Sequence, residues 1–533
     1  MLKPLADRHT LVARFAAFLS TTAFALATIA LSVAPARAQF GGMGGGGMGG
    51  MGGGGMGGMG GGGMGGMGGG GMGGGGMGGM GGGGMGGMGG GGMGGGGMGG
   101  LGSAAGAAGV MIDAQGVLRT CFVPDAGLSR QRRAAVFASL PGDIRQRSAL
   151  RKVSLRRLEA EVARAADEGR DVAEEIQKLA GMTRVQYVFV YPGEGSEPGD
   201  VVIAGPAEGW IADATGRVVG IETGSPTMLL EDLAAAIRAF EPGEPADTTI
   251  GCSIDPRAEG LAALQSFINK VGRVNPKASP SELVAGMVEA LGPQDVTVQG
   301  VAATTHFAQV MVEADYRMKL IGIGLERVPA RGMKSWVDLN ASTGVATNAL
   351  QRWYFTPDYE RVRATDDDLG IELVGRGVKL VGADEVVLPD GRRMSADRPD
   401  RASKTFTETF TRKYAEIAAR TPVYAQLRNL VDLSIVAAWM QEHDAYGKAG
   451  WGAETLRQET SYPIERLVAP VEVSPAINAI QRGNRLVTPI GGGVTMQPRL
   501  ALDPQNVVAD DEGTVAAARG EKLDLPAGRW WWD

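Results

Sequence analysis

The chain is short of the residues that most often bind metals or carry covalent catalysis. Two cysteines and three histidines occur among its 533 residues, and only His306 and His443 lie beyond the first 38. The sequence has no Gly-x-Ser-x-Gly turn, no His-Glu-x-x-His pair, no Cys-x-x-Cys pair and no phosphate loop ending in Gly-Lys-Ser or Gly-Lys-Thr. We therefore expect no zinc site of the usual Cys/His kind, no nucleotide-hydrolysing loop and no bound cofactor.

Basic charge and long apolar runs are also scarce. The chain has 52 Lys and Arg against 58 Asp and Glu, which gives a formal net charge of −6. Nucleic acids and anionic membrane surfaces usually bind proteins with a basic surplus, so we expect neither partner. Beyond the first 38 residues, the most apolar stretch is 430–440, which is short and contains Asp432. Spanning a bilayer takes about 17–25 residues, so no transmembrane helix is expected there.

The first 38 residues have the order of a secretory signal peptide. Lys3, Arg8 and Arg14 form a positive segment, and residues 15–33 then run without a charge. Ala-Arg-Ala at 36–38 supplies the small residues of a cleavage site. We expect an exported chain that is periplasmic or extracellular. The alternative is an uncleaved anchor, because the uncharged run is long enough to span a bilayer.

The two cysteines allow one disulfide in an oxidising compartment. A bond between Cys121 and Cys252 would close a loop of about 130 residues and would stabilise the fold by about 4–5 kcal/mol in the chain-entropy account. The alternative is a pair of separate thiols, because the sequence does not give the distance between them. Both interpretations stay open.

Residues 39–103 form a low-complexity arm, and residues 41–100 contain only Gly and Met. Glycine at this density loses too much backbone entropy on ordering for the scattered methionines to compensate, so we expect a flexible, disordered tether. An alternative function is soft-metal handling, because thioethers such as those of Met43, Met48, Met51 and Met56 are ligands that Cu(I) prefers.

The rest of the chain has irregularly alternating helix and strand patterns. We expect an α+β or irregular α/β region at 104–395 with a mixed sheet, followed at 396–533 by a pair of long helices and a C-terminal extension. Expected helices cover 154–169, 171–179, 225–240, 259–274, 279–292, 306–321, 403–420 and 423–442. Expected strands cover 185–191, 201–204, 217–221, 250–254, 350–355, 371–374 and 378–381.

Residues 306–321 fit two patterns. Alternating charges at 313, 315, 317 and 319 suit a strand, but each acid lies four residues before a base, which is the spacing of helix ion pairs. Phe307, Met311 and Met318 also fall on one helical stripe. We predict a helix. At the far end of the chain, three consecutive tryptophans at 530–532 would be costly to leave in water, so we expect them to dock on the body of the protein or to anchor a partner.

Five strings of the sequence are distinctive: VQYVFVYP at 185–192, VIAGPAEGW at 202–210, CSIDP at 252–256, FAQ at 307–309 and EADYRMK at 313–319. They resemble the planctomycete family of exported proteins catalogued as domain of unknown function 1598. The resemblance covers roughly residues 115–360. It implies an extracytoplasmic protein of a bacterium with an unusual envelope. The family has no established activity, so the resemblance implies no catalytic residue.

Three carboxylates in these strings are the candidates for chemistry. Asp255, Glu313 and Asp315 are of the type that cleaves glycosidic bonds when two of them face each other. The alternative interpretation places Glu313 and Asp315 in surface ion pairs with Arg317 and Lys319, and places Asp255 in a helix cap or turn before Pro256.

The leading hypothesis is an uncharacterised exported envelope protein. Its globular region would be a non-enzymatic binding or structural module on the Gly/Met tether, with an envelope protein or polymer as partner. The alternatives are a carboxylate-based hydrolase of an envelope polymer and a copper-handling protein.

Overall fold

The structure is a computed structural model, and it describes a defined part of the chain. The described residues are 106–124, 135, 138–195, 197–213, 215–243, 248–271, 280–328, 330–343, 351–359, 361–382, 385–387, 393–395, 401–478 and 490–533. The expected signal peptide at 1–38 and the Gly/Met arm at 39–103, with Met43, Met48, Met51 and Met56, lie outside them.

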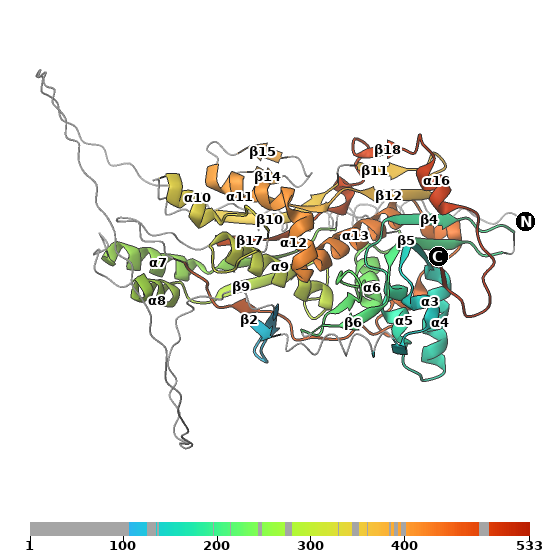
Figure 1. The fold of residues 1–533 in the computed structure, drawn as a ribbon, viewed down its shortest axis with the longest axis horizontal. Coiled ribbons are helices and arrows are strands. Elements are labelled where there is room, and N and C mark those ends of the chain that lie inside the picture. Colours follow the sequence, from blue (N-terminus) through green and yellow to red (C-terminus); the bar gives the residue numbers. More distant parts are fainter. Residues whose placement is uncertain are drawn as a thin grey trace, which may run out of the picture. The chain divides into compact units, whose positions relative to one another are not determined.

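The larger of two mixed sheets has eight strands among the described residues (Figure 1). In spatial order they are β1 (Gly106–Ile112), β2 (Val117–Pro124), β16 (Glu472–Val473), β9 (Gln294–Gln299), β8 (Ile250–Pro256), β17 (Ile490–Met496), β10 (Gln351–Asp358) and β13 (Gly377–Gly382). The pairs β2–β16 and β10–β17 are parallel, and the other neighbours are antiparallel.

The second sheet has seven strands in the same part of the chain. Their order is β18 (Val507–Ala509), β11 (Arg361–Ala364), β12 (Gly370–Val374), β4 (Tyr187–Tyr191), β5 (Asp200–Ala207), β3 (Ser148–Ser154) and β19 (Trp531–Trp532). Only the β11–β18 pair is parallel. Two small hairpins pair β6 (Trp210–Ala212) with β7 (Val218–Gly220) and β14 (Glu385–Val387) with β15 (Arg393–Ser395).

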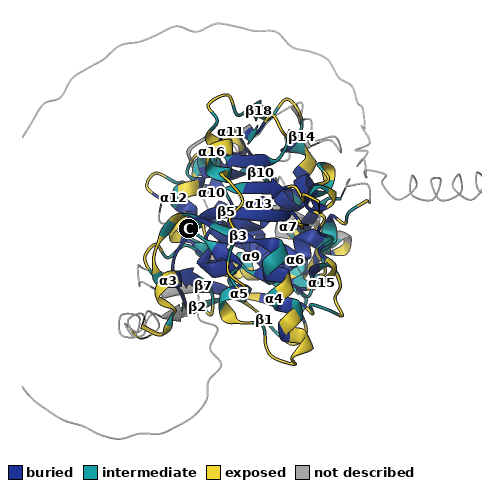
Figure 2. Ribbon diagram, turned by 90° about the vertical axis from the view of Figure 1, so that its right-hand side faces the viewer, coloured by how far each residue is buried: buried dark blue, intermediate teal, exposed yellow. Residues whose placement is uncertain are grey.

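Helices surround the sheets and also lie between them. Their bounds are α3 (Gly142–Arg145), α4 (Leu155–Asp167), α5 (Glu174–Gln177), α6 (Leu230–Ala239), α7 (Ala258–Val271), α8 (Pro280–Leu291), α9 (His306–Gly322), α10 (Trp336–Thr343), α11 (Arg401–Arg412), α12 (Tyr414–Arg420), α13 (Pro422–Glu442), α14 (Ala445–Ala449), α15 (Glu454–Arg457) and α16 (Thr514–Arg519). Figure 2 shows buried residues in the interior, including α13 and β10, and exposed residues on outer helices such as α4 and α12.

Helix α9 lies at the centre of this arrangement. Thr305 caps its start by accepting a hydrogen bond from the Ala308 amide at 3.2 Å. One side of α9 packs on β8 and β17, and α13 and α6 pack against it as well. From Phe307 onward, every residue of the helix except Gln309 is buried.

Glycines let the chain close tightly around Trp353 on β10. A side chain at Gly492 of β17 would lie 1.9 Å from the Trp353 carbonyl oxygen, and one at Gly322 of α9 would lie 2.0 Å from the indole ring. Gly492 also has a φ of +145°, which L-residues rarely adopt. Gly492 therefore permits the close pairing of β17 with β10, and Gly322 permits the close contact between α9 and the larger sheet.

The predicted fold class is confirmed, because the described residues form helices and two mixed sheets. The predicted helix at 306–321 is confirmed as α9, and the predicted helix at 154–169 as α4. Ser154 caps α4 by accepting a bond from the Arg157 amide, and the buried positions recur at helical spacing.

Two of the following details differ from the prediction, and the third was not predicted. Helix α6 begins at Leu230 rather than near 225, because Pro226 forms a bridge with Val219 that keeps the chain extended. The helix expected at 403–420 is two helices, α11 and α12, which meet at Lys413. The strands on either side of residues 375–376, β12 and β13, belong to different sheets.

The tryptophans at the end of the sequence dock on the body of the protein. Trp531 and Trp532 form β19, which pairs with β3 at Val153 and Lys152. Trp531 is 4% exposed, and its ring lies between two guanidinium groups, those of Arg151 and Arg529. Arg151 itself is fully buried and forms an ion pair with Asp533 at 2.8 Å. This segment therefore closes one edge of the second sheet.

We expect Trp531→Ala to lower the free energy of unfolding by about 3–5 kcal/mol, because it removes a buried ring and leaves a cavity. The matched control is Leu523→Ala, since Leu523 is 49% exposed, and it should change stability by less than about 0.5 kcal/mol. Chemical denaturation measures both. Equal stability of the Trp531 variant and the wild type would show that the docked segment does not support the fold.

Candidate functional site

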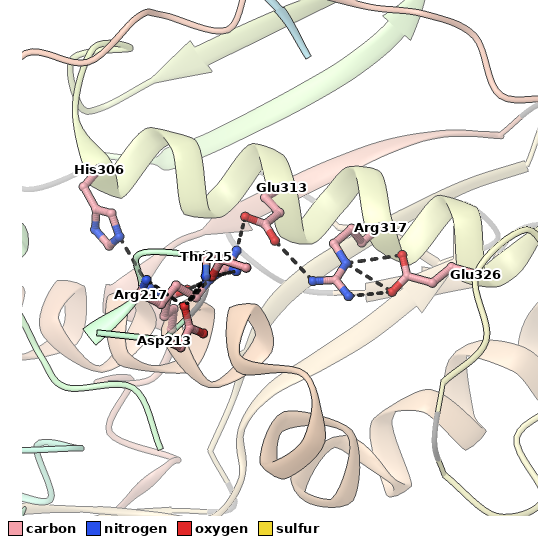
Figure 3. Close-up of polar contacts among 8 residues, drawn as sticks. Asp213, Thr215, Arg217, His306, Glu313, Arg317 and Glu326 are labelled. Atoms are coloured by element: carbon pink, nitrogen blue, oxygen red, sulfur yellow. Dashed lines mark hydrogen bonds and ion pairs between the residues drawn. The ribbon is translucent and has the colours of Figure 1, made fainter. Parts of the chain in front are cut away.

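A continuous chain of polar side chains runs along α9 on the side that faces α13 and the β6–β7 hairpin (Figure 3). It links three helices and the hairpin through hydrogen bonds and ion pairs. From one end to the other, the chain consists of Asp232, His306, Gln426, Arg217, Glu313, Arg317 and Glu326.

His306 forms the first part of this chain. Its Nδ1 atom lies 3.0 Å from Oδ2 of Asp232 on α6, and its Nε2 atom lies 3.3 Å from the amide nitrogen of Gln426 on α13. Burial lowers the pKa of His306, but the negative charges of Asp232 and Glu231 outweigh it, so the pKa lies above the ordinary 6.5.

Arg217 connects the β6–β7 hairpin to both helices. Its Nε atom donates to Oε1 of Gln426 at 2.9 Å, and its Nη2 atom pairs with Glu313 on α9. Asp213 shapes the turn that presents it, because the Asp213 carboxylate accepts from the backbone amides of Thr215 and Arg217. Arg217 was not predicted as a site residue, since nothing in its spacing relates it to residues 313 or 426.

Glu313 and Arg317 occupy consecutive turns of α9. Arg317 donates to Glu313 at 3.2 Å and to Glu326 at 2.7 Å, and the side chains of Glu313 and Arg317 are 7% and 6% exposed. The expectation of a surface ion pair is therefore wrong. Helix α13 packs against α9, and Arg217 of the hairpin reaches Glu313, so Glu313 neutralises buried cations instead of facing solvent.

Asp315 and Lys319 form a second buried pair on another side of the same helix. Lys319 Nζ lies 2.8 Å from Asp315 and also donates to the carbonyl oxygens of Ile254 and Gly492, at 3.2 and 3.3 Å. Burial raises the pKa of Asp315 to about 6, although Lys319 opposes the shift. This pair, too, was expected at the surface, but it packs against β8 and β17.

Asp255 lies within strand β8, opposite Asp295 of β9, and not in a cap or turn. Its carboxylate pairs with Arg352 of β10 at 2.5 Å, across β17, which is glycine at the intervening positions. The expectation of a cap is wrong because the strand continues through Pro256. Both partners are about two-fifths exposed.

The three candidate carboxylates do not converge on one point. Residues two apart on a helix point about 200° away from each other, so Glu313 faces α13 while Asp315 faces the sheet. Asp255 raises the pKa of Asp315, which makes these two electrostatic neighbours, but a cation lies against each of them. Each carboxylate thus has a positive partner within the protein.

A pocket of about 560 Å³ opens next to the His306 end of the polar chain. It lies between the second half of α6, the loop before α9 and residues 459–466. Small and apolar residues share its walls with charged ones, and the lining consists of Ala235, Arg238, Ala239, Gly300, Val301, Ala302, Thr304, Thr305, Glu459, Ile464, Glu465 and Arg466. None of the three candidate carboxylates lines this pocket.

Charged side chains of both signs lie at the pocket and beside it. Arg238 pairs with Glu459, and Arg466 approaches the same carboxylate at 3.8 Å. Glu231 lies on α6 beside Asp232, and burial, Asp232 and Glu465 together raise the pKa of Glu231 to about 7. A carboxyl group next to this pocket therefore changes charge near neutral pH.

The structure does not bring the two cysteines together. Both thiols are free, and Cys121 on β2 is separated from Cys252 on β8 by strands β16 and β9. Three strand spacings of about 4.8 Å exceed the reach of a disulfide. Within the described residues, no group of three or more His, Cys, Asp or Glu is arranged to hold a metal ion. The same part of the chain contains no helix with the length and apolarity to cross a membrane.

Comparison with known proteins gives one match. Residues 252–336 match the family model described as Protein of unknown function (DUF1598), which confirms the resemblance in the strings at 252–256, 307–309 and 313–319. The strings at 185–192 and 202–210 lie outside the matched range. No curated protein and no solved structure matches the chain.

We expect Arg317→Met to lower the free energy of unfolding by about 3–5 kcal/mol, because it leaves Glu326 without its cation and Glu313 with Arg217 alone. Lys404→Met is the matched control, since Lys404 and Glu408 form an exposed pair at the same helix spacing, and exposed pairs contribute about 0.5 kcal/mol or less. Urea denaturation compares the two. Similar losses of unfolding free energy in both variants would mean that the ion pairs on α9 stabilise the protein no more than a surface pair does.

Replacing Glu231 by Gln should stabilise the protein in a pH-dependent way. The folded state binds a proton at Glu231 more tightly than the unfolded state, so this contribution falls as pH rises from about 4.5 through about 7. Glu231→Gln should be roughly 1–3 kcal/mol more stable than wild type above pH 7 and equal to it below pH 4.5. Thermal unfolding across pH 4–9 tests this, with Glu282→Gln, in the exposed first turn of α8, as the control. A pH-independent difference would contradict the prediction.

Proposed function

We propose that the chain is an exported envelope protein whose globular region binds an envelope partner without changing it chemically. The Gly/Met arm serves as a flexible tether between this region and the N-terminus. Export follows from the pattern of residues 1–38, and the tether follows from the composition of residues 41–100.

One observation carries the non-enzymatic part of the proposal. Asp255, Glu313 and Asp315 each lie against an Arg or Lys side chain, and none lines the described pocket. Glycoside hydrolysis needs two carboxyl groups about 5–10 Å apart across an accessible bond, one of them free to give up a proton. Glu313 and Asp315 are neutralised by buried cations and hold α9 in place, and Asp255 joins β8 to β10 through Arg352.

The pocket supports the binding part of the proposal. Apolar residues such as Val301, Ala302 and Ile464 form part of its lining, and Arg466 and Glu465 supply charge of both signs. Concave sites that combine apolar walls with a few polar groups are the usual form of a ligand or partner site. Arg466 is 77% exposed, so a partner can reach it.

A photo-crosslinking residue at position 466, in cells that produce the full chain, tests the binding site. We expect a reproducible envelope adduct that disappears in an Ala302→Trp background, because Ala302 is an exposed lining residue and a large ring there fills the pocket. The matched control is the same crosslinker at Lys404, which is also exposed but lies on α11.

Three outcomes contradict the proposal. Identical adducts from positions 466 and 404 would contradict a specific site. Turnover of an envelope polymer by the purified chain, lost in Glu313→Gln, would replace the binding module with a hydrolase. Retention of the chain in the cytoplasm, with no difference after deletion of residues 1–38, would contradict export.

A further inference from the structure

We propose that His306 is a proton-sensitive joint in the polar chain along α9. In its neutral form the ring accepts a hydrogen bond from Gln426, and a proton on Nε2 forces Gln426 to release either His306 or Arg217. The proposal concerns the contact between α13, α9 and the β6–β7 hairpin, and it does not depend on export or on the pocket's ligand.

The direction of the hydrogen bonds around Gln426 is fixed by Arg217. A guanidinium group has donors and no acceptor, so the side-chain atom of Gln426 that lies 2.9 Å from Arg217 Nε is the carbonyl oxygen. The amide nitrogen of Gln426 then faces His306 Nε2 at 3.3 Å. Because that nitrogen can only donate, Nε2 of His306 must accept, and the ring proton must lie on Nδ1.

The other side of the ring agrees with this assignment. Nδ1 of His306 lies 3.0 and 3.1 Å from the two carboxylate oxygens of Asp232, which accept its proton. The chain of bonds therefore runs in one direction, from Arg217 through Gln426 to His306 and on to Asp232. In each residue of this chain, the atom that accepts or donates one hydrogen bond determines the role left for the next bond.

A second proton on the ring creates a conflict at Gln426. Nε2–H of His306 would point at the amide N–H groups of Gln426, so two donors would face each other. Rotating the amide by 180° would satisfy His306 but would turn the same N–H groups toward Nε–H of Arg217. One hydrogen bond is lost in either orientation, while Arg217 keeps its contacts with Glu313 and Thr215.

The charges around the ring decide how readily it takes up the second proton. Asp232 and Glu231 of α6 favour the protonated ring, with Glu465 acting through Glu231, whereas Arg217 of the hairpin opposes it. The positive end of α9, where His306 is the first residue, also opposes the second proton. The balance holds the pKa of His306 above 6.5, so the ring gains its second proton at a higher pH than a free imidazole does.

The expected consequence is a local loosening that begins beside the pocket. Gln426 belongs to α13, which packs on both α6 and α9. Thr305, next to His306, caps α9 and lines the pocket. Acidification therefore weakens the attachment of the hairpin to α13 at the same place where the loop before α9 meets the pocket.

The test is nuclear magnetic resonance of the full chain with ¹⁵N-labelled histidine. The chain has only His9, His306 and His443, so His9→Gln and His443→Gln assign the signals. We expect His306 at high pH to carry its proton on Nδ1 and to show an unprotonated Nε2. A proton on Nε2 instead would overturn the proposal, and this readout needs no change at the site itself.

Two variants of Gln426 test the conflict. Gln426→Met removes the bond that favours the neutral ring and should raise the pKa of His306 by about half a unit to one unit. Gln426→Glu should raise it further, because a carboxylate accepts from both His306 and Arg217. Gln309→Met is the matched control on α9, since Gln309 bonds the Val468 carbonyl instead, and it should leave the titration unchanged. An unchanged or lower pKa in Gln426→Met would overturn the proposal.

Discussion

The burial of α9 is the constraint on which the rest of this structure depends. The helix carries four charged side chains at 313, 315, 317 and 319, and all four are almost completely removed from water. Moving an unpaired ion from water into a protein interior costs several kcal/mol, so every one of these charges needs a partner inside the fold. Much of the architecture around the helix supplies those partners: the β6–β7 hairpin supplies Arg217, the loop after α9 supplies Glu326, and β8 and β17 supply carbonyl oxygens.

Because of their spacing, the four charges lie on two sides of the helix, and each side has its own partners. Glu313 and Arg317 are four residues apart and share one stripe, and Asp315 and Lys319 share another. The first pair is extended by side chains from the hairpin and the loop, which forms a polar chain that ends at His306. The second pair rests on backbone carbonyls of the sheet, which Lys319 reaches because β17 has glycine where other strands carry side chains. The four-residue spacing that predicted a helix also determines which neighbouring elements each ion pair contacts.

That spacing shows how far the sequence could predict the structure. It predicted α9 and its two ion pairs correctly, because helix periodicity and charge order are local properties of residues 306–321. It placed the pairs at the surface because nothing local shows what covers a helix. Arg217, Gln426 and Arg352 were missed for the same reason, since each lies about 100 residues or more from its partner. For Asp255 the prediction relied on the Pro256 that follows it, whereas the pairing of β8 with β9 and β17 decided its conformation.

The family match has a physical consequence that follows from these contacts. Residues 252–336 contain most of β8, all of β9 and α9, and the helical pair α7–α8, and they include all three candidate carboxylates. Yet this segment supplies only some of the partners of its own polar residues. Asp255 depends on Arg352, Glu313 depends in part on Arg217, and His306 depends on Asp232 and Gln426, all outside the matched range. Without Arg217, Arg317 would be the one cation left between Glu313 and Glu326. The matched segment is therefore the centre of a larger fold that supplies part of its polar contacts. Any function that it carries must be understood together with α6, α13, the β6–β7 hairpin and strands β10 and β17.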